Sequence, residues 1–380
     1  MNSETKQYKL WDTEVNLHLE SVPSDDEMKQ MNEDLGNPTR GYFQTPEGKL
    51  HYLEFIPSPF DSNSDGINSS NGIKAVCVFQ HGIQSSSNSV VKLVNPDDNS
   101  ITYTNMGLLG RKFKAANIAL YCPDMLGHGF SEGKRFYIPH GNGQINRDGL
   151  ARFATFVGEK HGSVPLFICG ESYGANLALQ VAKMWQNSKD NDSKSKNVDK
   201  DEPSFTKPPR GFEGICINAP AIVGDLPPAP LRFFLQYVLA PLIPESTPFF
   251  MPHPISPERI WRDEVVRKTQ TSVEVKKRGL SAGAVPYRLG TALGLVNALH
   301  TVQKEVIPGF NVPFSVCHGT DDWGVKIEGS KLLVENCDTK EEDRAAFFVD
   351  GAYHDLFSDP CMNDVVDFHI KFIESRIKPL

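Results

Sequence analysis

The sequence predicts an α/β fold: a mostly parallel central sheet flanked by helices, with a lid inserted before its last strands. Short apolar runs of strand length alternate with longer runs of helical periodicity, which is typical of βαβ units. Segment 221–307, rich in Pro, Leu and Phe before it turns helical, is too long for a simple connection and too apolar for a linker. We interpret it as a lid over the carboxyl edge of the sheet, where such folds form their sites.

The predicted elements follow one another in order. Residues 41–57 read as a hairpin that turns at Glu47 and Gly48. The run "IKAVCVFQ" (73–80) is apolar and β-branched, as in a strand buried on both faces. Further strands are predicted at 118–124, 165–170, 212–220, 313–319 and 345–351. Helices are predicted at 105–117, 145–162, 173–186 and 361–378.

This order suggests a division of the chain into an N-terminal extension, two parts of one core, and the lid between them. The corresponding ranges are 1–40, 41–220, 308–380 and, for the lid, 221–307. Two polar segments, 61–72 and 187–210, contain almost no apolar residues and cannot bury enough surface to offset the cost of ordering them. We expect both to be flexible insertions, the second of them disordered.

Composition excludes several classes of protein. The chain has 380 residues, of which 39% are hydrophobic and 23% are charged, as in an ordinary globular protein. Its net charge of −8 lacks the basic character with which proteins neutralise nucleic-acid phosphates, so no nucleic-acid partner is expected. Seven cysteines without regular spacing do not form a disulfide framework, and no Cys-x-x-Cys or His-x-x-x-His pair suggests a metal site.

The same composition indicates a cytoplasmic protein. Five cysteines lie in short apolar runs and look like buried, reduced thiols. The first 20 residues are polar and show no signal-peptide core. The most apolar stretch, 226–252, is interrupted by Arg232, Gln236 and several prolines, so we do not interpret it as a membrane span.

One pentapeptide suggests a nucleophile. "GESYG" places Ser172 between Gly170 and Gly174. Alone it is a weak signal, but a predicted strand precedes it and a predicted helix follows it, which is the context a nucleophile elbow requires. The flanking glycines let strand and helix pass closely, and the hydroxyl then projects at the helix N-terminus.

A serine nucleophile needs a base and an acid that orients the base. His354 follows the last predicted strand, and Asp322 follows the strand before it, so the order is Ser, Asp, His. Asp321 is the alternative acid, with a loop-capping role as its other interpretation. The other histidines in predicted helices or in the hairpin, among them His51 and His369, are expected to be ordinary surface or boundary residues. Those expected to fill structural roles in turns are His81, His128 and His318.

Acyl transfer also needs backbone N–H groups that stabilise an oxyanion. One donor is expected from Tyr173, the residue after the nucleophile. The other is expected from Ile83, because the loop "HGIQSSS" follows the strand 73–80 and bends at His81-Gly82. The alternative interpretation of His81-Gly82 is a simple turn.

Together these motifs resemble a known family. "VFQHGI", "YCPDMLGHGFSEGKR", "CGESYGANLAL", "VCHGTDDWGV" and "VDGAYHDLF" occur in the order and spacing of the monoacylglycerol lipase/lysophospholipase branch of the α/β-hydrolases. This branch includes the serine aminopeptidase-like and plant caffeoylshikimate esterase-like proteins. The block Asp124–Gly133 is the most specific piece, and the similarity runs from about residue 41 to the C-terminus, weakly through the lid.

The resemblance implies an α/β-hydrolase fold and a cofactor-free serine hydrolase acting on carboxylic esters of acylglycerols or lysophospholipids. Ser172 would be the nucleophile, Asp322 the acid and His354 the base, with Ile83 and Tyr173 as oxyanion donors. Members often have Met where this chain has Tyr173, and its loop after His81-Gly82 is unusually Ser-rich. Both departures bear on the substrate and leave the triad intact.

The predicted lid suggests a lipid ester substrate. Its run "LRFFLQYVLAPLI" (231–243) offers apolar side chains to an acyl chain or to a membrane surface, namely Phe233, Phe234, Leu235, Val238 and Leu239. Burying an acyl chain contributes ~0.8 kcal/mol per CH₂. The alternative is that these side chains pack the lid onto the body.

Three alternative functions remain at this stage. An acyltransferase would use the same acyl-enzyme and pass the acyl group to another alcohol. A catalytically silent binding protein would usually lack a triad member, and here none is missing. A peptidase of this fold needs recognition of a peptide amine, for which the lid shows no residue.

Overall fold

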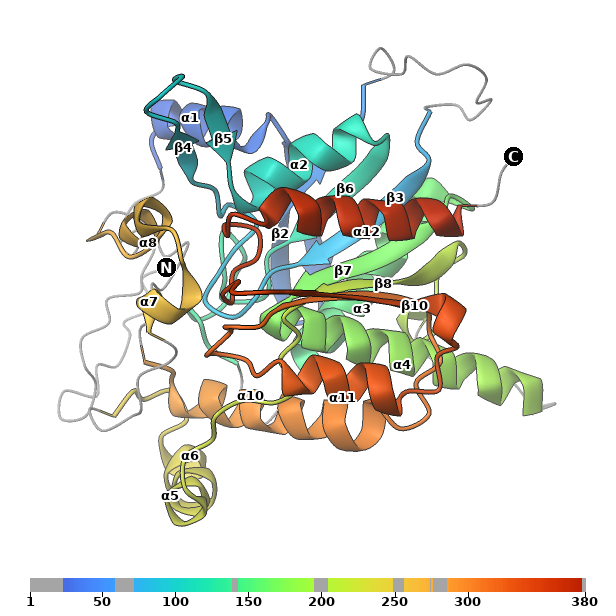
Figure 1. The fold of residues 1–380 in the computed structure, drawn as a ribbon. Coiled ribbons are helices and arrows are strands. Elements are labelled where there is room, and N and C mark those ends of the chain that lie inside the picture. The colour runs from blue at the N-terminus through green and yellow to red at the C-terminus, as the bar shows by residue number, and fades with distance from the viewer. Residues whose placement is uncertain are drawn as a thin grey trace.

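A three-layer arrangement of helices, sheet and helices organises the chain. The computed structural model describes residues 23–58, 72–138, 143–194, 204–248, 256–273, 275 and 286–377. Within them, the strands form an eight-stranded sheet in the order β1-β2-β6-β3-β7-β8-β9-β10. Figure 1 shows α2 and α12 on one face of this sheet and α3, α4 and α11 on the other.

Every predicted strand is confirmed within a few residues. The bounds are β1 Thr39–Thr45, β2 Gly48–Phe55, β3 Ala75–Gln80, β6 Ile118–Pro123, β7 Leu166–Glu171, β8 Phe212–Asn218, β9 Phe314–Gly319 and β10 Arg344–Val349. β1 and β2 form the antiparallel hairpin, β2 pairs antiparallel with β6, and the other pairs are parallel. The sheet is therefore mostly parallel, as the alternation of runs predicted.

Helices cover both faces, and this explains the continuous apolar strands. The bounds are α1 Asp25–Leu35, α2 Asn105–Ala115, α3 Gln144–His161, α4 Ser172–Lys194, α11 Glu328–Asn336 and α12 Met362–Arg376. All residues of β3, β6 and β9 are buried. One core lies between the sheet and α3 with α4, and includes Phe153, Leu177 and Trp185; the other, beside α2 and α12, includes Phe113.

Several elements differ from the sequence prediction. Helix α4 continues to Lys194, eight residues into the segment expected to be a disordered insertion. Later in that segment Phe205 is buried, and its carbonyl accepts a hydrogen bond of 2.8 Å from Trp185 Nε1. Helix α1 was not predicted, although Ser24 and Glu27 form a capping box at its start. Residues 61–71 of the other expected insertion lie outside the described residues.

Three further elements were also missed because they are short. β4 Lys92–Val94 and β5 Ile101–Tyr103 form a small separate hairpin. Helix α11 follows the loop that carries Asp322. A strand of three residues or a helix of nine carries too little periodicity for a sequence prediction.

Residues 221–307, called the insertion below, contribute helices near the carboxyl ends of the parallel strands (Figure 1). The helices are α5 Ala229–Phe234, α6 Ala240–Leu242, α7 Pro257–Ile260, α8 Glu264–Gln270 and α10 Leu289–Thr301. Wide π-turns at Leu235–Leu239 and Val302–Val306 extend α5 and α10. Ala240 and Leu289 are buried against each other's helices, so α6 packs on α10.

His369 is buried, and its expected place at the surface or a boundary is wrong. Its Nδ1 lies 2.8 Å from Ser315 Oγ, and its Nε2 lies 3.0 Å from Asn218 Oδ1. These contacts suit a neutral ring that donates from Nε2 and accepts at Nδ1. Burial lowers the pKa of His369 to about 3, and burial with a contribution from His81 does the same for His128.

These two histidines predict a loss of stability in mild acid. Both stay neutral in the folded chain, whereas in the unfolded chain each binds a proton below about pH 6.5. The stabilisation is therefore complete above pH 6.5 and decreases as the pH falls towards 3. Urea unfolding between about pH 7 and 4.5, above the range where carboxylates protonate, measures the slope. His369→Gln should make that slope shallower; an unchanged slope would contradict the assignment.

Candidate active site

Ser172 occupies a strained turn between β7 and α4. Its φ is +52°, a left-handed conformation that a side chain rarely adopts. The two flanking glycines allow this turn. A Cβ on Gly174 would lie 2.1 Å from the Gln80 carbonyl oxygen, and one on Gly170 would lie 2.7 Å from the Gly174 carbonyl carbon. The helix therefore passes the strands at a distance that only glycine permits.

Asp322 and His354 form a hydrogen-bonded pair. Asp322 Oδ2 lies 2.6 Å from His354 Nδ1, and both residues follow the ends of neighbouring strands, β9 and β10. The other carboxylate oxygen, Oδ1, accepts from the N–H groups of Gly324 and Val325 at 2.8 and 2.9 Å. Every oxygen of this buried carboxylate thus has a donor, which fixes its orientation.

The two groups shift each other's pKa in opposite directions. Burial alone would raise the pKa of Asp322, but His354 and His318 beside it hold that pKa well below its usual range. Burial would lower the pKa of His354, but the Asp322 carboxylate outweighs it and raises that pKa. A carboxylate that stays ionised beside a histidine holds the ring in one tautomer and stabilises its protonated form.

A second histidine contacts the same carboxylate. His318 Nε2 lies 3.1 Å from Asp322 Oδ2 and 2.9 Å from the Val325 carbonyl, while its Nδ1 lies 2.7 Å from Ser330 Oγ. The expected turn role is correct but incomplete, because His318 also supports the acid. The four-residue spacing between His318 and Asp322 in "HGTDD" could have indicated this contact, but the sequence analysis used the motif only to select the acid.

The loop after β3 lies against Ser172. A Cβ on Gly82 would come within 3.2 Å of Ser172 Cβ and 3.7 Å of its Oγ. His81 fixes the loop, since its Nδ1 lies 2.7 Å from the Gly82 carbonyl and its Nε2 accepts from the Met125 N–H at 3.1 Å. Ile83 follows directly, and no acceptor among the described residues pairs with its N–H.

Asp124 anchors the far end of that loop. Its carboxylate accepts from the N–H groups of Ser87 (2.6 Å) and Phe130 (3.1 Å) and lies 2.7 Å from His51 Nδ1. Burial would raise the pKa of Asp124, but His51 and His81 lower it to about 2. His51 is therefore a buried partner of this carboxylate, and its expected place as a surface or boundary residue is wrong.

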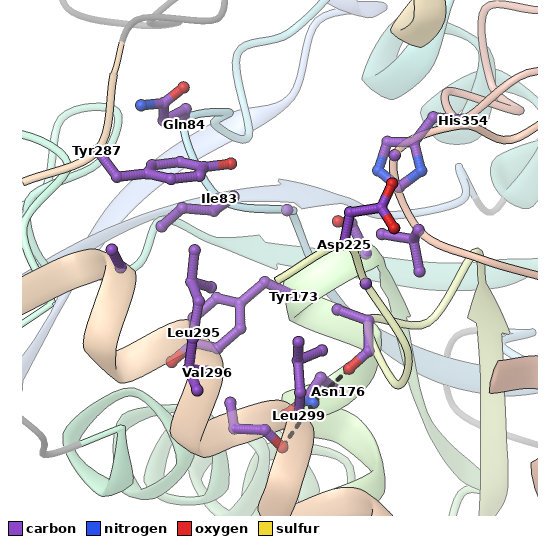
Figure 2. A pocket seen from close by; sticks show the side chains of 18 of the residues that line it. Ile83, Gln84, Tyr173, Asn176, Asp225, Tyr287, Leu295, Val296, Leu299 and His354 are labelled. Atoms are coloured by element: carbon purple, nitrogen blue, oxygen red, sulfur yellow. Dashed lines mark hydrogen bonds between the residues drawn. The ribbon is translucent and has the colours of Figure 1, made fainter. Parts of the chain in front are cut away.

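Ser172, His354 and Ile83 line one cavity of about 870 Å³. Its wall comes from the body and from the insertion, which contributes Leu231, Leu235, Leu295, Val296 and Leu299. Figure 2 shows Ile83, Tyr173, Leu295 and Val296 on one side of the pocket and His354 with Asp225 on the other. A large, mostly apolar cavity beside a few polar groups suits an apolar ligand with one reactive polar group.

Tyr173 contributes its ring to this cavity. The side chain is 1% exposed, and burial raises the pKa of its hydroxyl to about 12. Its backbone N–H lies in the first turn of α4, where helices leave such groups without an intrahelical acceptor. Tyr173 can therefore narrow the cavity with its ring and offer its N–H at the nucleophile.

Two carboxyl groups that the sequence analysis did not single out also line the cavity. Glu171 precedes Ser172, and Asp355 follows His354. Burial, and then the charge of Asp355, raises the pKa of Glu171; burial also raises that of Asp355. A negative charge on one of these carboxyl groups disfavours ionisation of the other. Each is adjacent in sequence to a predicted triad member, but only the fold brings them together.

The apolar residues of α5 and its π-turn divide between the cavity and the surface. Leu235 lines the cavity, and Leu239 packs against the small cluster around Ala240 and Leu289. Five side chains of this segment are exposed by 39 to 62%, namely Leu231, Phe233, Phe234, Tyr237 and Val238, and Leu242 of α6 is exposed by 73%. Leu231 and Leu235 thus line the cavity, whereas Leu239 packs within the insertion and not on the body.

The described residues contain neither a cluster suited to a metal ion nor a helix that could span a membrane. Across 23–377, apart from the undescribed gaps, no three His, Cys, Asp or Glu side chains are arranged to hold a metal ion. No helix in the same part of the chain is both long and apolar enough to cross a membrane.

The fold and the placement of these residues define an α/β-hydrolase. A strained serine after β7, an acid after β9 and a histidine after β10 lie at the carboxyl edge of the sheet, and the serine and the histidine line one cavity. Residues 102–191 and 204–361 match the model of the family described as serine aminopeptidase, S33, and the chain belongs to that family.

Individual relatives agree with this assignment. The chain is 24% identical over 324 residues to caffeoylshikimate esterase of Arabidopsis thaliana, covering 84% of this chain and 79% of the relative. It is 22% identical to monoacylglycerol lipase of Mycolicibacterium smegmatis over 71% of this chain and 82% of the relative. A solved structure of a soluble variant of Saccharomyces cerevisiae monoglyceride lipase superposes with a TM-score of 0.59 at 16% identity, covering 90% and 96%. Fold, family and relatives place the chain among the esterases and lipases of the α/β-hydrolase class.

Proposed function

We propose that this protein hydrolyses the carboxylic ester of a lipid monoester, of the monoacylglycerol or lysophospholipid type, through an acyl-enzyme on Ser172. The observation that carries the proposal is the Asp322–His354 pair in the same apolar cavity as a serine with φ of +52°. The relatives named for monoacylglycerol lipase activity support the substrate class.

The proposed reaction needs only groups of this chain. His354 Nε2 takes the proton of Ser172 Oγ as Oγ attacks the ester carbonyl carbon, while Asp322 holds His354 Nδ1–H. The N–H groups of Ile83 and Tyr173 stabilise the oxyanion. The C–O bond then breaks, and His354 gives its proton to the leaving alcohol. Water attacks the acyl-enzyme by the reverse proton path and releases the acid.

The insertion supports a lipid substrate. Its apolar side chains line the cavity, where an acyl chain gains ~0.8 kcal/mol for each CH₂ it buries. The exposed side chains of α5, its π-turn and α6, among them Phe233 at 62% and Leu242 at 73%, are the basis for proposing peripheral membrane contact. We propose that the protein acts in the cytoplasm, since all seven cysteines are free thiols.

Ser172→Ala tests the nucleophile. A fluorophosphonate probe should label the wild type covalently and leave the variant unlabelled, and ester hydrolysis should fall by about 10⁴-fold or more because no acyl-enzyme forms. Labelling of the variant equal to that of the wild type would overturn the assignment.

A substrate panel tests the ester class. p-Nitrophenyl esters of increasing chain length should show a preference for longer acyl chains, because the cavity wall is apolar. A flat or short-chain preference would contradict a lipid substrate, and cleavage of aminoacyl p-nitroanilides in place of esters would indicate a peptidase. Adding a second alcohol and analysing products distinguishes hydrolysis from acyl transfer.

A further inference from the structure

Three consecutive residues of the insertion contact the loop that carries His354. The Ile260 carbonyl accepts from the Asp355 N–H at 3.2 Å. Trp261 Nε1 donates to Asp355 Oδ2 at 2.8 Å. Arg262 Nη1 donates to the Gly351 carbonyl at 3.1 Å. Main chain and side chain of the insertion are therefore both bonded to this loop on either side of His354.

The tryptophan ring is held by packing between the insertion and the core. Its ring is 8% exposed and packs in a small cluster with Val91 and Val266. Helix α8, which carries Val266, starts with a side-chain cap from Asp263. Because the ring is buried, packing determines the direction of its N–H. The position of the donor to Asp355 is therefore fixed by the packing of Trp261.

Asp355, in the loop that carries His354, has few hydrogen-bond donors around its carboxyl group. Its Oδ2 accepts from Trp261 and, at 3.4 Å, from Asn105 Nδ2, while its buried Oδ1 has no hydrogen-bond partner. Glu171 adds a second carboxyl group to the same cavity, and the negative charge of Asp355 raises the pKa of Glu171. Loss of the Trp261 donor would leave a buried carboxyl group with one long hydrogen bond, and such a group moves towards other donors or water.

His354 is adjacent to this residue in the chain, so displacement of Asp355 moves the backbone that carries the imidazole. We propose that Trp261 and Asp355 form a latch between the insertion and the His354 loop, and that both are positioning residues for the base. This inference rests on the proposed function. A 1 Å displacement of a group that must meet the reacting atoms reduces turnover by about 100-fold.

A double-mutant cycle tests the latch. The variants are Trp261→Phe, which keeps an aromatic ring but removes the indole N–H, Asp355→Ala, and the two combined. Each is assayed on the intact protein with p-nitrophenyl butyrate, a soluble ester, for kcat and KM, and for its rate of labelling by the fluorophosphonate. Trp185→Phe is the matched control, since its buried Nε1 also donates one hydrogen bond, to the Phe205 carbonyl, away from the cavity.

The expected result is a selective loss of turnover. Trp261→Phe should lower kcat and the labelling rate by about 10- to 100-fold with KM changed less than about threefold. Asp355→Ala should lower kcat and the labelling rate at least as much as Trp261→Phe. The double variant should have the same kcat as Asp355→Ala, because the contact can be lost only once. Trp185→Phe should lower thermal stability and leave kcat unchanged.

Three results would overturn the latch. The first is wild-type kcat in Trp261→Phe, and the second is a loss in the double variant equal to the product of the single losses. The third is a loss of kcat in Trp185→Phe as large as in Trp261→Phe, which would indicate a general effect of stability. If Asp355→Ala does not fold, the comparison of kcat between Trp261→Phe and its control Trp185→Phe tests the latch. Failure of the wild type to label at Ser172 would instead refute the proposed function itself.

Discussion

Asp322→Asn is expected to lower kcat by about 10⁴-fold with little change in KM. Asp322 Oδ1 accepts from two backbone N–H groups, so an asparagine would place its own oxygen there. Its amide nitrogen would then face His354 Nδ1, which must accept a hydrogen bond. The imidazole proton would move to Nε2, and that nitrogen would no longer take a proton from Ser172.

Asp321→Asn is the matched control for this prediction. Asp321 is exposed, and its own backbone N–H bonds to the Ala352 carbonyl. Asp321→Asn therefore removes a charge from the loop that also carries Asp322, and it leaves the contact of Asp322 with His354 unchanged. We expect kcat within about twofold of the wild type, consistent with the small effects of exposed charges. Equal losses in both variants would show that the loop, and not the Asp322–His354 bond, is responsible.

Gly174→Ala is expected to destabilise the fold by about 3 kcal/mol or more. The added Cβ would lie 2.1 Å from the Gln80 carbonyl oxygen and 2.5 Å from that of His81. Both are backbone atoms of β3 and of the loop carrying Ile83, so relief of the clash must separate α4 from the sheet. Urea unfolding or the thermal midpoint measures the loss.

Gly149→Ala provides the contrasting substitution in a helix. Gly149 is also buried, in α3, but a Cβ there would meet only Leu50 Cδ1 at 3.8 Å, an ordinary contact. We expect it to stabilise the protein by about 0.5–1 kcal/mol, because alanine loses less backbone entropy in a helix than glycine. A large loss in both variants would mean that glycine flexibility, and not close approach at Gly174, explains the effect.

Particular elements show how much of the fold could be predicted from the sequence. The strands β3, β6, β7 and β9 are short apolar runs buried on both faces, so their pattern alone was sufficient. Helix α4 continues to Lys194, and its end could not be predicted because a run of polar residues has no apolar period that marks where a helix stops. The histidines were the weakest point: His51 and His369 are buried with partners far away in the chain.

The sequence by itself determined the order and spacing of Ser172, Asp322 and His354, because each follows an apolar strand and parallel strands end at one edge. The 2.6 Å bond between Asp322 and His354 then follows from neighbouring strands, β9 and β10. Only the tertiary structure decided which groups surround that pair. Contacts such as Trp261 on Asp355 join residues 94 positions apart, and no local pattern encodes them because they arise when the insertion packs on the core.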